Sequence, residues 1–543
     1  MCYLILIVNL IIMTNKPLRK SWILVLLSVS LVIFGCSQTL KDDYRSNIVL
    51  IMVDDMGYSD IGCYGGEIET PNIDNLAYTG IRFSNFYNNA ICVPTRASLL
   101  TGMYPQKAGV YTNEPKKYKN SVTLAEVLKE AGYRTLMVGK WHAEETPYQR
   151  GFERHFGLCD GAANHFNPGP KRMGEREPGR KISTVPRGYP RRWAVDGQEF
   201  EPYVTKDSAH YSTDTYTDYA LDYLEEYKHD EKPFFLYVAY TAPHYPLHAW
   251  PGDIEKYRGK YLKGWDSLRV DRFRRLKDLG LIPENILLCD RDNAVPQWED
   301  IENKDEWDLT MAVYAAMIDR VDQNVGRILN KLDELGEREN TLIVFLSDNG
   351  GCAEDANYTP NIAPGPVESY RSVGKPWAIA SNTPYKKYKK WCHEGGIKTP
   401  MIVNWPKYIK QPKITEHVGH IIDFMPTLLD IAEADYPTEY NGQTISPYDG
   451  KSLLPVILGN EAEGHDVLYW QSSPKKQRAI RKGKWKLVSE GENYGTELYN
   501  LEEDLLEENN VSKLYPEVVQ ELDSLFYIWS KSVGSGQQEY IEK

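Results

Sequence analysis

The sequence predicts an α/β protein in which helices flank a large central, mostly parallel sheet, and a smaller α+β subdomain follows at the C-terminus. Three observations lead to this prediction. Four apolar runs end abruptly in polar residues, which is typical of strands buried on both faces of a parallel sheet. Helical patterns alternate with these runs, as the crossovers between parallel strands require. Beyond residue 432, glycine and proline interrupt the pattern and short strand patterns follow.

The apolar runs place polar side chains at one edge of the predicted sheet. The runs cover residues 48–53, 135–138, 234–240 and 342–346. They lead into Asp54 and Asp55, into Lys140 and His142, into His244, and into Asp348 and Asn349. Ligands of open α/β sheets bind beyond the carboxyl ends of the strands. We therefore expect these side chains to meet at one rim.

The helices and the domain boundaries follow from the same pattern. Residues 318–335 carry one apolar face and stop before Gly336, a residue type that suits a left-handed helix end. Further helices are predicted at 213–227, 426–431 and 516–529, and short strands at 485–488 and 497–499. We place the main domain at 46–432 and the C-terminal subdomain at 433–543.

The N-terminus has the features of an export signal. Lys16, Arg19 and Lys20 precede an apolar run at 22–34, and Gly35 and Cys36 follow it. This order predicts a signal peptide at 1–35, with Met13 as an alternative start. The run Ile33-Phe34-Gly35-Cys36 resembles a bacterial lipobox, which makes Cys36 the lipidated first residue and 36–45 a tether; the alternative is an uncleaved membrane anchor. We expect an exported, periplasmic or outer-membrane lipoprotein of a bacterium that meets the membrane only through its lipid.

The composition excludes some classes of protein. The chain has 543 residues, of which 26% are charged and 42% hydrophobic, as is ordinary for a soluble globular protein. The net charge of −13 argues against nucleic acid as a partner, because phosphate backbones demand a basic face. No Cys/His spacing suggests zinc, and the eight cysteines do not form a disulfide framework.

The run Cys92-Val93-Pro94-Thr95-Arg96 is the most informative stretch of the chain. Its cysteine lies one turn ahead of an arginine, and the proline between them suits the start of a helix. Backbone N–H groups and the positive end of the helix dipole gather anions at such a position. The alternative is a buried thiol at a loop-to-helix junction.

Two runs together resemble the signatures of the type I sulfatases. The first is the run that begins at Cys92 and continues through 97–102, and the second is 132–142, GYRTLMVGKWH. Val93 departs from the small residue that is usual there. The resemblance implies an alkaline-phosphatase-like fold and cleavage of sulfate esters. It also implies a maturation enzyme that oxidises Cys92 to formylglycine (3-oxoalanine).

A metal site is predicted at the rim. Asp54, Asp55, Asp348 and Asn349 offer only oxygen ligands, which favours Ca²⁺, with Mg²⁺ as the rival. Carboxylates crowded at strand ends repel one another unless a cation lies between them. The alternative is that each acidic residue caps a helix. The resemblance implies calcium at these positions, with the formylglycine made from Cys92 completing the shell.

The resemblance also implies roles for the residues nearby. Residue 92, as a hydrated aldehyde, offers one hydroxyl to attack sulfur and a second whose deprotonation expels sulfate. Arg96 can hydrogen-bond the hydrate and the carboxylates. Lys140 is a point charge for sulfate, and His142 is a partner of the hydrate. His244 is the candidate general acid for the leaving oxygen.

One further lysine is placed by its distance from a glycine motif. The family has a lysine five residues before the glutamate of Glu-Gly-Gly, which here begins at Glu394, so the match is Lys389. The neighbouring lysines Lys386, Lys387 and Lys390 leave the register open. A solvated basic loop is the alternative.

The substrate is predicted only as a class: a sulfated carbohydrate or an aryl sulfate. Residues 257–298 resemble the arylsulfatase branch and are expected near the pocket mouth. A basic stretch at 171–192 could bind a polyanionic glycan or be a solvated loop. Two other functions remain open. One is a phosphonate monoester or phosphodiester hydrolase of the same superfamily, and the other is a non-catalytic, lipid-anchored glycan-binding protein.

Overall fold

The computed structural model describes residues 45–168, 191–200, 203–205, 207, 209–472, 477–490 and 495–534, which belong to one compact unit. The predicted signal peptide, Cys36 and most of the tether lie outside these residues. Among the described helices, none has the length and apolar character that crossing a bilayer requires. The cysteines within the described ranges are all free thiols.

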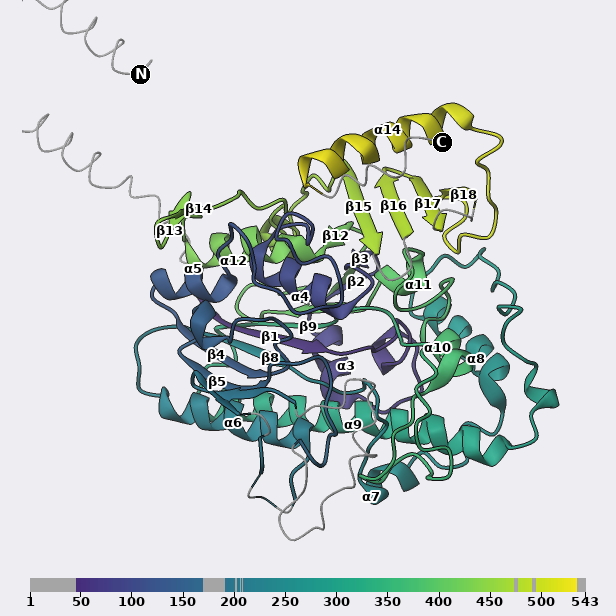
Figure 1. The fold of residues 1–543 in the computed structure, drawn as a ribbon, viewed down its shortest axis with the longest axis horizontal. Coiled ribbons are helices and arrows are strands. Elements are labelled where there is room, and N and C mark those ends of the chain that lie inside the picture. Colours follow the sequence, from purple (N-terminus) through teal and green to yellow (C-terminus); the bar gives the residue numbers. More distant parts are fainter. Residues whose placement is uncertain are drawn as a thin grey trace, which may run out of the picture. The chain divides into compact units, whose positions relative to one another are not determined.

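Ten strands form the main sheet, in the order β11-β2-β10-β9-β1-β8-β4-β5-β6-β7 (Figure 1). Its central strands are β9 (Thr341–Ser347), β1 (Asn47–Val53), β8 (Phe234–Ala239) and β4 (Arg134–Gly139), which pair in parallel. The other strands are β2 (Ile81–Phe83), β5 (Arg154–Leu158), β6 (Trp193–Val195), β7 (Gln198–Phe200), β10 (Met401–Asn404) and β11 (Lys413–Thr415). Antiparallel pairs occur toward both edges. The four predicted strands and the α/β class are confirmed.

The register of the central strands brings their carboxyl ends to one level. Met52 of β1 pairs with Ala239 of β8 and with Leu346 of β9, and Ala239 pairs in turn with Gly139 of β4. The residues that follow these four strands therefore emerge side by side.

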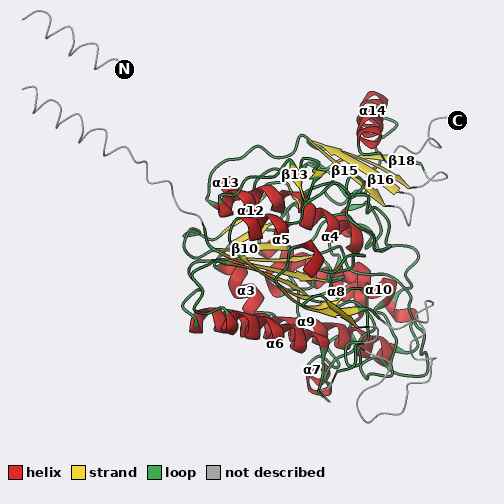
Figure 2. Ribbon diagram, turned by 60° about the vertical axis from the view of Figure 1, so that its left-hand side comes forward, coloured by secondary structure: helices red, strands yellow, loops and turns green. Residues whose placement is uncertain are grey.

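Helices cover both faces of the sheet. Figure 2 shows α4, α5 and α12 on one face and α3, α6 and α9 on the other. Their bounds are α3 (Pro71–Tyr78), α4 (Cys92–Thr101), α5 (Leu124–Glu130), α6 (Ser212–Glu226), α9 (Lys304–Glu334) and α12 (Phe424–Ala432). The predicted helices at 213–227 and 426–431 are confirmed as α6 and α12. The helix predicted at 318–335 is the second half of α9, which begins 14 residues earlier than expected.

The C-terminal region builds a separate antiparallel sheet of four strands. These are β15 (Val467–Ser472), β16 (Gln477–Lys482), β17 (Trp485–Glu490) and β18 (Thr496–Asn500). The final helix α14 (Pro516–Ser532) lies over them (Figure 1). The two predicted strands and the predicted terminal helix are confirmed, whereas the boundary at residue 432 stays a prediction.

The faces of this small sheet have different partners. Leu468, Trp470 and Val488 pack with Tyr87 and Ile397 of the main domain. The side chains on the opposite face pack with α14 and include Ile480, Leu487 and Leu498, which contact Leu522, Phe526 and Trp529. Successive side chains of a strand point to opposite faces of the sheet, so each strand contributes to both contacts. The small sheet is therefore packed onto the main domain and is covered by the last helix.

The remaining elements are short or lie in the connections. They are α7 (Pro251–Glu255), α8 (Gly264–Asp278), α10 (Gly374–Ser381), α11 (Glu394–Ile397), α13 (Leu454–Ile457), β3 (Phe86–Tyr87), β12 (Gly419–His420), β13 (Glu439–Tyr440) and β14 (Gln443–Thr444).

Candidate active site

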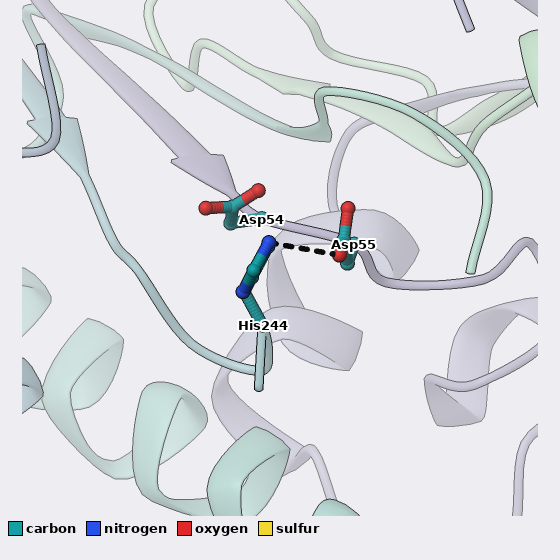
Figure 3. A group of neighbouring side chains, drawn as sticks. All are labelled: Asp54, Asp55 and His244. Carbon is teal, nitrogen blue, oxygen red and sulfur yellow. Dashed lines mark ion pairs between the residues drawn. The ribbon is translucent and has the colours of Figure 1, made fainter. Parts of the chain in front are cut away.

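The structure brings the predicted strand-end residues together. Asp54 and Asp55 directly follow β1, and His244 lies in the turn after β8 and faces them (Figure 3). One ligand atom from each of these three side chains lies within 4.8 Å of the others. We call the following residues the strand-end centre: Asp54, Asp55, Cys92, Arg96, Lys140, His142, His244, Asp348, Asn349 and Lys389.

The acidic part of the centre contains buried oxygens that lack a partner. Asn349 donates from Nδ2 to Asp55 Oδ1 at 2.7 Å, and the Asp55 amide donates to Asp348 Oδ1 at 3.2 Å. Within the described chain, Asp54 Oδ1 and Asn349 Oδ1 are buried without a hydrogen-bond partner. Burial and the adjacent Asp54 raise the pKa of Asp348 to about 6. Unpartnered oxygens beside crowded carboxylates fit a hard divalent cation.

Each carboxylate of the centre also pairs with one cationic side chain. Lys140 Nζ lies 2.6 Å from Asp54 Oδ2, and Lys389 Nζ lies 2.7 Å from Asp55 Oδ1. Arg96 Nη2 lies 2.9 Å from Asp348 Oδ2. Buried charges of this kind need a partner, because removing one member leaves an uncompensated charge. The three carboxylates are therefore balanced by three cations, and two side-chain oxygens still lack a hydrogen bond among the described residues.

Arg96 also fixes the backbone of the neighbouring strand end. Its Nη1 donates to the Lys140 carbonyl at 3.0 Å and to the Tyr237 hydroxyl at 3.4 Å. The side chain is fully buried, so these bonds hold it in one position. Arg96 thus connects α4 to the ends of β4 and β9.

Cys92 lies at the first residue of α4, as its sequence context predicts. Its Sγ donates to Asn113 Oδ1 at 3.4 Å. Burial raises the pKa of the thiol, and the charges of Lys140 and Lys389 act in the opposite direction. The unmodified side chain is therefore a neutral thiol that lies within electrostatic reach of the cations of the centre.

His142 follows β4 in a left-handed conformation, with a φ of 63°. Burial lowers the pKa of His142 well below its usual range, and Lys140 and Arg96 lower it further. The ring lies against Gly161, where an added Cβ would come within 2.7 Å of Nε2. His142 is thus a neutral imidazole whose position depends on a glycine.

His244 faces the centre through one defined nitrogen. Its Nδ1 donates to the Tyr245 carbonyl at 2.6 Å, because a carbonyl oxygen can only accept. Its Nε2 lies 3.4 Å from Asp55 Oδ2 (Figure 3). Burial lowers the pKa of His244 to about 4, although Asp55 acts to raise it. His165 donates from Nε2 to the His244 carbonyl at 3.0 Å and so fixes this turn.

The four neighbouring lysines have separate partners. Lys389 reaches Asp55, whereas Lys386 donates to the Tyr499 hydroxyl at 3.2 Å. The other two point to acidic residues outside the centre: Lys387 to Asp292 at 3.7 Å, and Lys390 to Glu354. Of these four lysines, Lys389 is thus the one that lies in the strand-end centre, and its role as the sulfate ligand stays a prediction.

Two further segments singled out in the sequence have other surroundings. Residues 171–190 of the basic stretch lie outside the described residues. Arg192, at its end, donates to the carbonyls of Ala143 and Glu144 at 2.6 and 2.7 Å, so it ties two loops together. In the segment 257–298, Asp292 reaches the lysine loop through Lys387.

Sequence patterns missed several residues around the centre. Asn113 contacts Cys92 from a loop, and Gly161 supports His142 from another. Glu354 pairs with Lys390 and accepts a hydrogen bond from Tyr245. None of these positions belongs to a periodic apolar run, so no periodic signal marked them.

Comparisons with known proteins assign the family. The sulfatase family model matches residues 46–434, and the model described as N-sulphoglucosamine sulphohydrolase, C-terminal, matches residues 385–527. The chain belongs to the sulfatase family. It is a sulfuric ester hydrolase of the type I sulfatases, as the two signatures predict.

Curated relatives match over most of their length. An uncharacterized sulfatase of Schizosaccharomyces pombe is 33% identical, over 90% of this chain and 94% of its own. An arylsulfatase of Klebsiella aerogenes is 32% identical, over 79% of this chain and 95% of its own. An N-acetylglucosamine-6-O-sulfatase of Bacteroides thetaiotaomicron is 26% identical, over 92% and 88%.

A solved structure shares the fold of this sulfatase. The crystal structure of Ps i-CgsB in complex with k-i-k-neocarrahexaose superposes with a TM-score of 0.65 at 27% identity. The match covers 91% of this chain and 94% of that chain. The two family models together span residues 46–527, which include the main sheet and the C-terminal sheet.

Proposed function

We propose that this sulfatase hydrolyses sulfate esters on a carbohydrate at the strand-end centre, with residue 92 acting as the nucleophile after oxidation to formylglycine. The observation that carries the proposal is the convergence of three buried carboxylates and three buried cations on one edge of the sheet, with Cys92 within electrostatic reach of Lys140, Lys389, Asp54 and Asp348. Two relatives support a sugar substrate. One is named an N-acetylglucosamine-6-O-sulfatase, and the other is solved in complex with k-i-k-neocarrahexaose.

We propose that Asp54, Asp55, Asp348 and Asn349 hold a divalent cation, Ca²⁺ in preference to Mg²⁺. The buried, unpartnered oxygens of Asp54 and Asn349 support this assignment. When bound, the cation supplies a Lewis acid for a sulfate oxygen.

The cationic side chains of the centre suit a sulfate group. We propose that Lys140 and Lys389 stabilise the negative charge that develops on the sulfuryl oxygens. Arg96 holds the backbone of Lys140 and the carboxylate of Asp348, so it positions both. His142, kept neutral by burial, can accept a hydrogen bond from the side chain at residue 92.

His244 is proposed to protonate the leaving oxygen from Nε2, because Nδ1 is occupied by the Tyr245 carbonyl. Burial lowers the pKa of this histidine to about 4, so it is neutral at pH 7 without a substrate. An incoming sulfate ester brings a negative charge beside it, and a nearby opposite charge raises the pKa of an imidazole. Substrate binding therefore favours the protonated form that an acid requires.

Export and maturation complete the proposal. We propose that the chain is a bacterial lipoprotein of the periplasm or outer membrane, anchored through Cys36, and that a formylglycine-generating enzyme converts Cys92. The sequence before residue 46 supports export. The mass of the mature N-terminus checks this: an unacylated Cys36 or an uncleaved leader contradicts it.

The proposed nucleophile is tested by Cys92→Ala in protein coexpressed with a maturation system. Peptide mass spectrometry of the unsubstituted protein is expected to show an aldehyde at residue 92. The variant is expected to lose at least about 1,000-fold in turnover, because the attacking group is gone. Its far-UV circular dichroism is expected to match that of the unsubstituted protein. Undiminished turnover would remove residue 92 from the mechanism.

The same preparation separates the alternative functions. Sulfate release is measured from O-sulfated N-acetylhexosamines and from 4-nitrophenyl sulfate, beside bis(4-nitrophenyl) phosphate. A higher kcat/KM on the phosphodiester would favour the phosphodiesterase function. Binding of sulfated glycans without turnover, with residue 92 still a thiol, would favour a non-catalytic protein.

A further inference from the structure

A second charged group lies beside the strand-end centre and has no role in the chemistry proposed above. It consists of Tyr245, Glu354 and Lys390, which we call the rim cluster. The Tyr245 hydroxyl donates to Glu354 Oε2, and Lys390 Nζ pairs with Glu354 Oε1. One carboxylate thus joins three segments that are far apart in the sequence.

Two members of the rim cluster are covalent neighbours of residues in the centre. Tyr245 follows His244, and the two rings lie 4.4 Å apart between centroids. Lys390 follows Lys389, which is paired with Asp55. Glu354 therefore spans the gap between the proposed acid and the proposed sulfate-binding lysine. If His244 protonates the leaving oxygen, as proposed above, the group attached to that oxygen starts next to Tyr245.

Exposure increases from the centre to the rim. The side chains of Asp55 and Lys389 are 1% and 3% exposed, whereas those of Glu354 and Lys390 are both 28% exposed. The rim cluster is thus more accessible to solvent than the buried pair next to it.

The backbone of Lys390 is held in a conformation that a lysine rarely adopts. Its φ is 75°, in the left-handed region, which costs about 1 kcal/mol or more for a residue with a Cβ. Its amide donates to the Ala90 carbonyl at 2.8 Å, and its carbonyl accepts from Ser472 Oγ at 3.0 Å. These bonds fix the direction in which the side chain leaves the loop, next to Lys389.

The rim cluster has the chemistry of a site for sugar hydroxyls. Burial would raise the pKa of Glu354, but Lys389 and Lys390 lower it to about 2, so the carboxylate is ionised. A carboxylate accepts hydrogen bonds, an ammonium donates them, and a phenol ring offers a face that packs against apolar C–H groups. A diol on a pyranose ring needs both an acceptor and a donor.

We propose that Glu354 and Lys390 bind free hydroxyls of the sugar ring that carries the scissile sulfate, with Tyr245 packing against that ring. This inference rests on the proposed function, since it concerns the leaving group of the same reaction. The rim cluster then favours sulfated sugars over aryl sulfates, because a nitrophenyl ring has no hydroxyl to offer.

The test compares two substrates in the matured enzyme. Glu354→Gln and Lys390→Met are measured on an O-sulfated N-acetylhexosamine and on 4-nitrophenyl sulfate. A hydrogen bond to a charged group contributes about 1.5–3 kcal/mol, so kcat/KM on the sugar is expected to fall roughly 10- to 100-fold. On the aryl sulfate it is expected to change less than about 3-fold. Glu461→Gln, at an exposed carboxylate of the C-terminal region, is the control and is expected to change neither value.

Deoxygenated substrates sharpen the test. On a sugar that lacks the hydroxyl bound by Glu354, the unsubstituted enzyme loses activity and Glu354→Gln causes no further loss. An equal fall on both substrates would overturn the inference and make Glu354 a support for Lys389. Unchanged activity on the sugar would also overturn it. An unsubstituted enzyme that releases no sulfate from any substrate would overturn the proposed function itself, and this inference with it.

Discussion

Two buried groups of charged side chains differ in how completely they are paired. The anchor cluster, defined as Glu394, Lys398, Lys486 and Glu507, connects α11 to the C-terminal sheet. Lys486 Nζ lies 2.7 Å from Glu394 Oε1 and 2.8 Å from Glu507 Oε1. The other two oxygens accept from the Tyr87 hydroxyl at 2.7 Å and from the Glu394 amide at 2.8 Å. Three of the four carboxylate oxygens of the anchor cluster thus accept a hydrogen bond, and the fourth, Glu507 Oε1, is paired with Lys486 but lacks a hydrogen bond among the described residues.

The strand-end centre is equally buried, but its oxygens are not all partnered. Asp54 Oδ1 and Asn349 Oδ1 have no hydrogen bond among the described residues. The unbonded oxygen of the anchor cluster, Glu507 Oε1, still lies 2.8 Å from Lys486 Nζ, whereas the lysine that pairs with Asp54 lies 2.6 Å from the other oxygen, Oδ2. An unpaired buried acceptor costs about 1–3 kcal/mol, which a bound ligand would recover. Among the described residues, the strand-end centre thus contains two side-chain oxygens without a hydrogen bond, and the anchor cluster contains one.

Removing the divalent cation is expected to have the largest effect. Chelation followed by dialysis is expected to abolish most sulfate release, and Ca²⁺ is expected to restore it better than Mg²⁺. Because the ion binds the folded state, Ca²⁺ at 100 times its Kd is expected to add about 2.7 kcal/mol to the free energy of unfolding. Calorimetric titration and thermal unfolding in Ca²⁺ measure this.

Two variants test whether the cation binds at the strand-end centre. Asp54→Asn is expected to lose the gain in Tm with Ca²⁺, and Lys482→Met, on the exposed side of β16, to keep it. No change in the Tm of the unsubstituted protein with either ion would contradict the metal assignment, even if activity were lost for another reason.

Lys486→Met is expected to have the largest effect on stability. It leaves the carboxylates of Glu394 and Glu507 buried without their shared cation, which costs about 3–5 kcal/mol. Lys482→Met is the matched control, because Lys482 pairs with Glu521 at the surface and such pairs contribute about 0–1 kcal/mol. Urea unfolding followed by circular dichroism measures both. Equal losses in the two variants would show that the anchor cluster does not stabilise the fold.

The sequence predicted the parts of this molecule that repeat a simple pattern. An apolar run that ends in polar residues marks a buried strand, and parallel strands end at one edge, so the positions of Asp54, His244 and Asp348 could be inferred. The first half of α9 could not. Its residues 311–319 are buried on every side, so they show no amphipathic period.

Contacts made by loop residues could not be predicted, because no apolar run or helical period marks them in the sequence. Lys389 was placed by its distance from Glu394, but the separate partners of the adjacent lysines required the structure. Glu354 and Asn113 lie in connections whose course is set by tertiary packing. The same holds for the anchor cluster, whose members come from three distant segments.

The smallest expected effect concerns Lys398, the most weakly held cation of the anchor cluster. Burial lowers the pKa of Lys398 from 10.5 to about 8, although Glu394, 3.5 Å away, acts to raise it. Between pH 8 and 10.5 the unfolded chain then binds more protons than the folded chain, so this group makes stability rise with pH in that window. Below pH 8 lysine is protonated in both states, and the full free-energy cost of burying its charge is present.

Lys398→Met is therefore expected to be more stable than the unsubstituted protein at pH 7, by about 3 kcal/mol at most. Urea unfolding at pH 7, 8.5 and 10 is expected to show this advantage shrinking as the pH rises, whereas the small effect of Lys482→Met stays constant. An advantage that does not change with pH would mean that Lys398 keeps an ordinary pKa and that the anchor cluster holds all of its cations equally well.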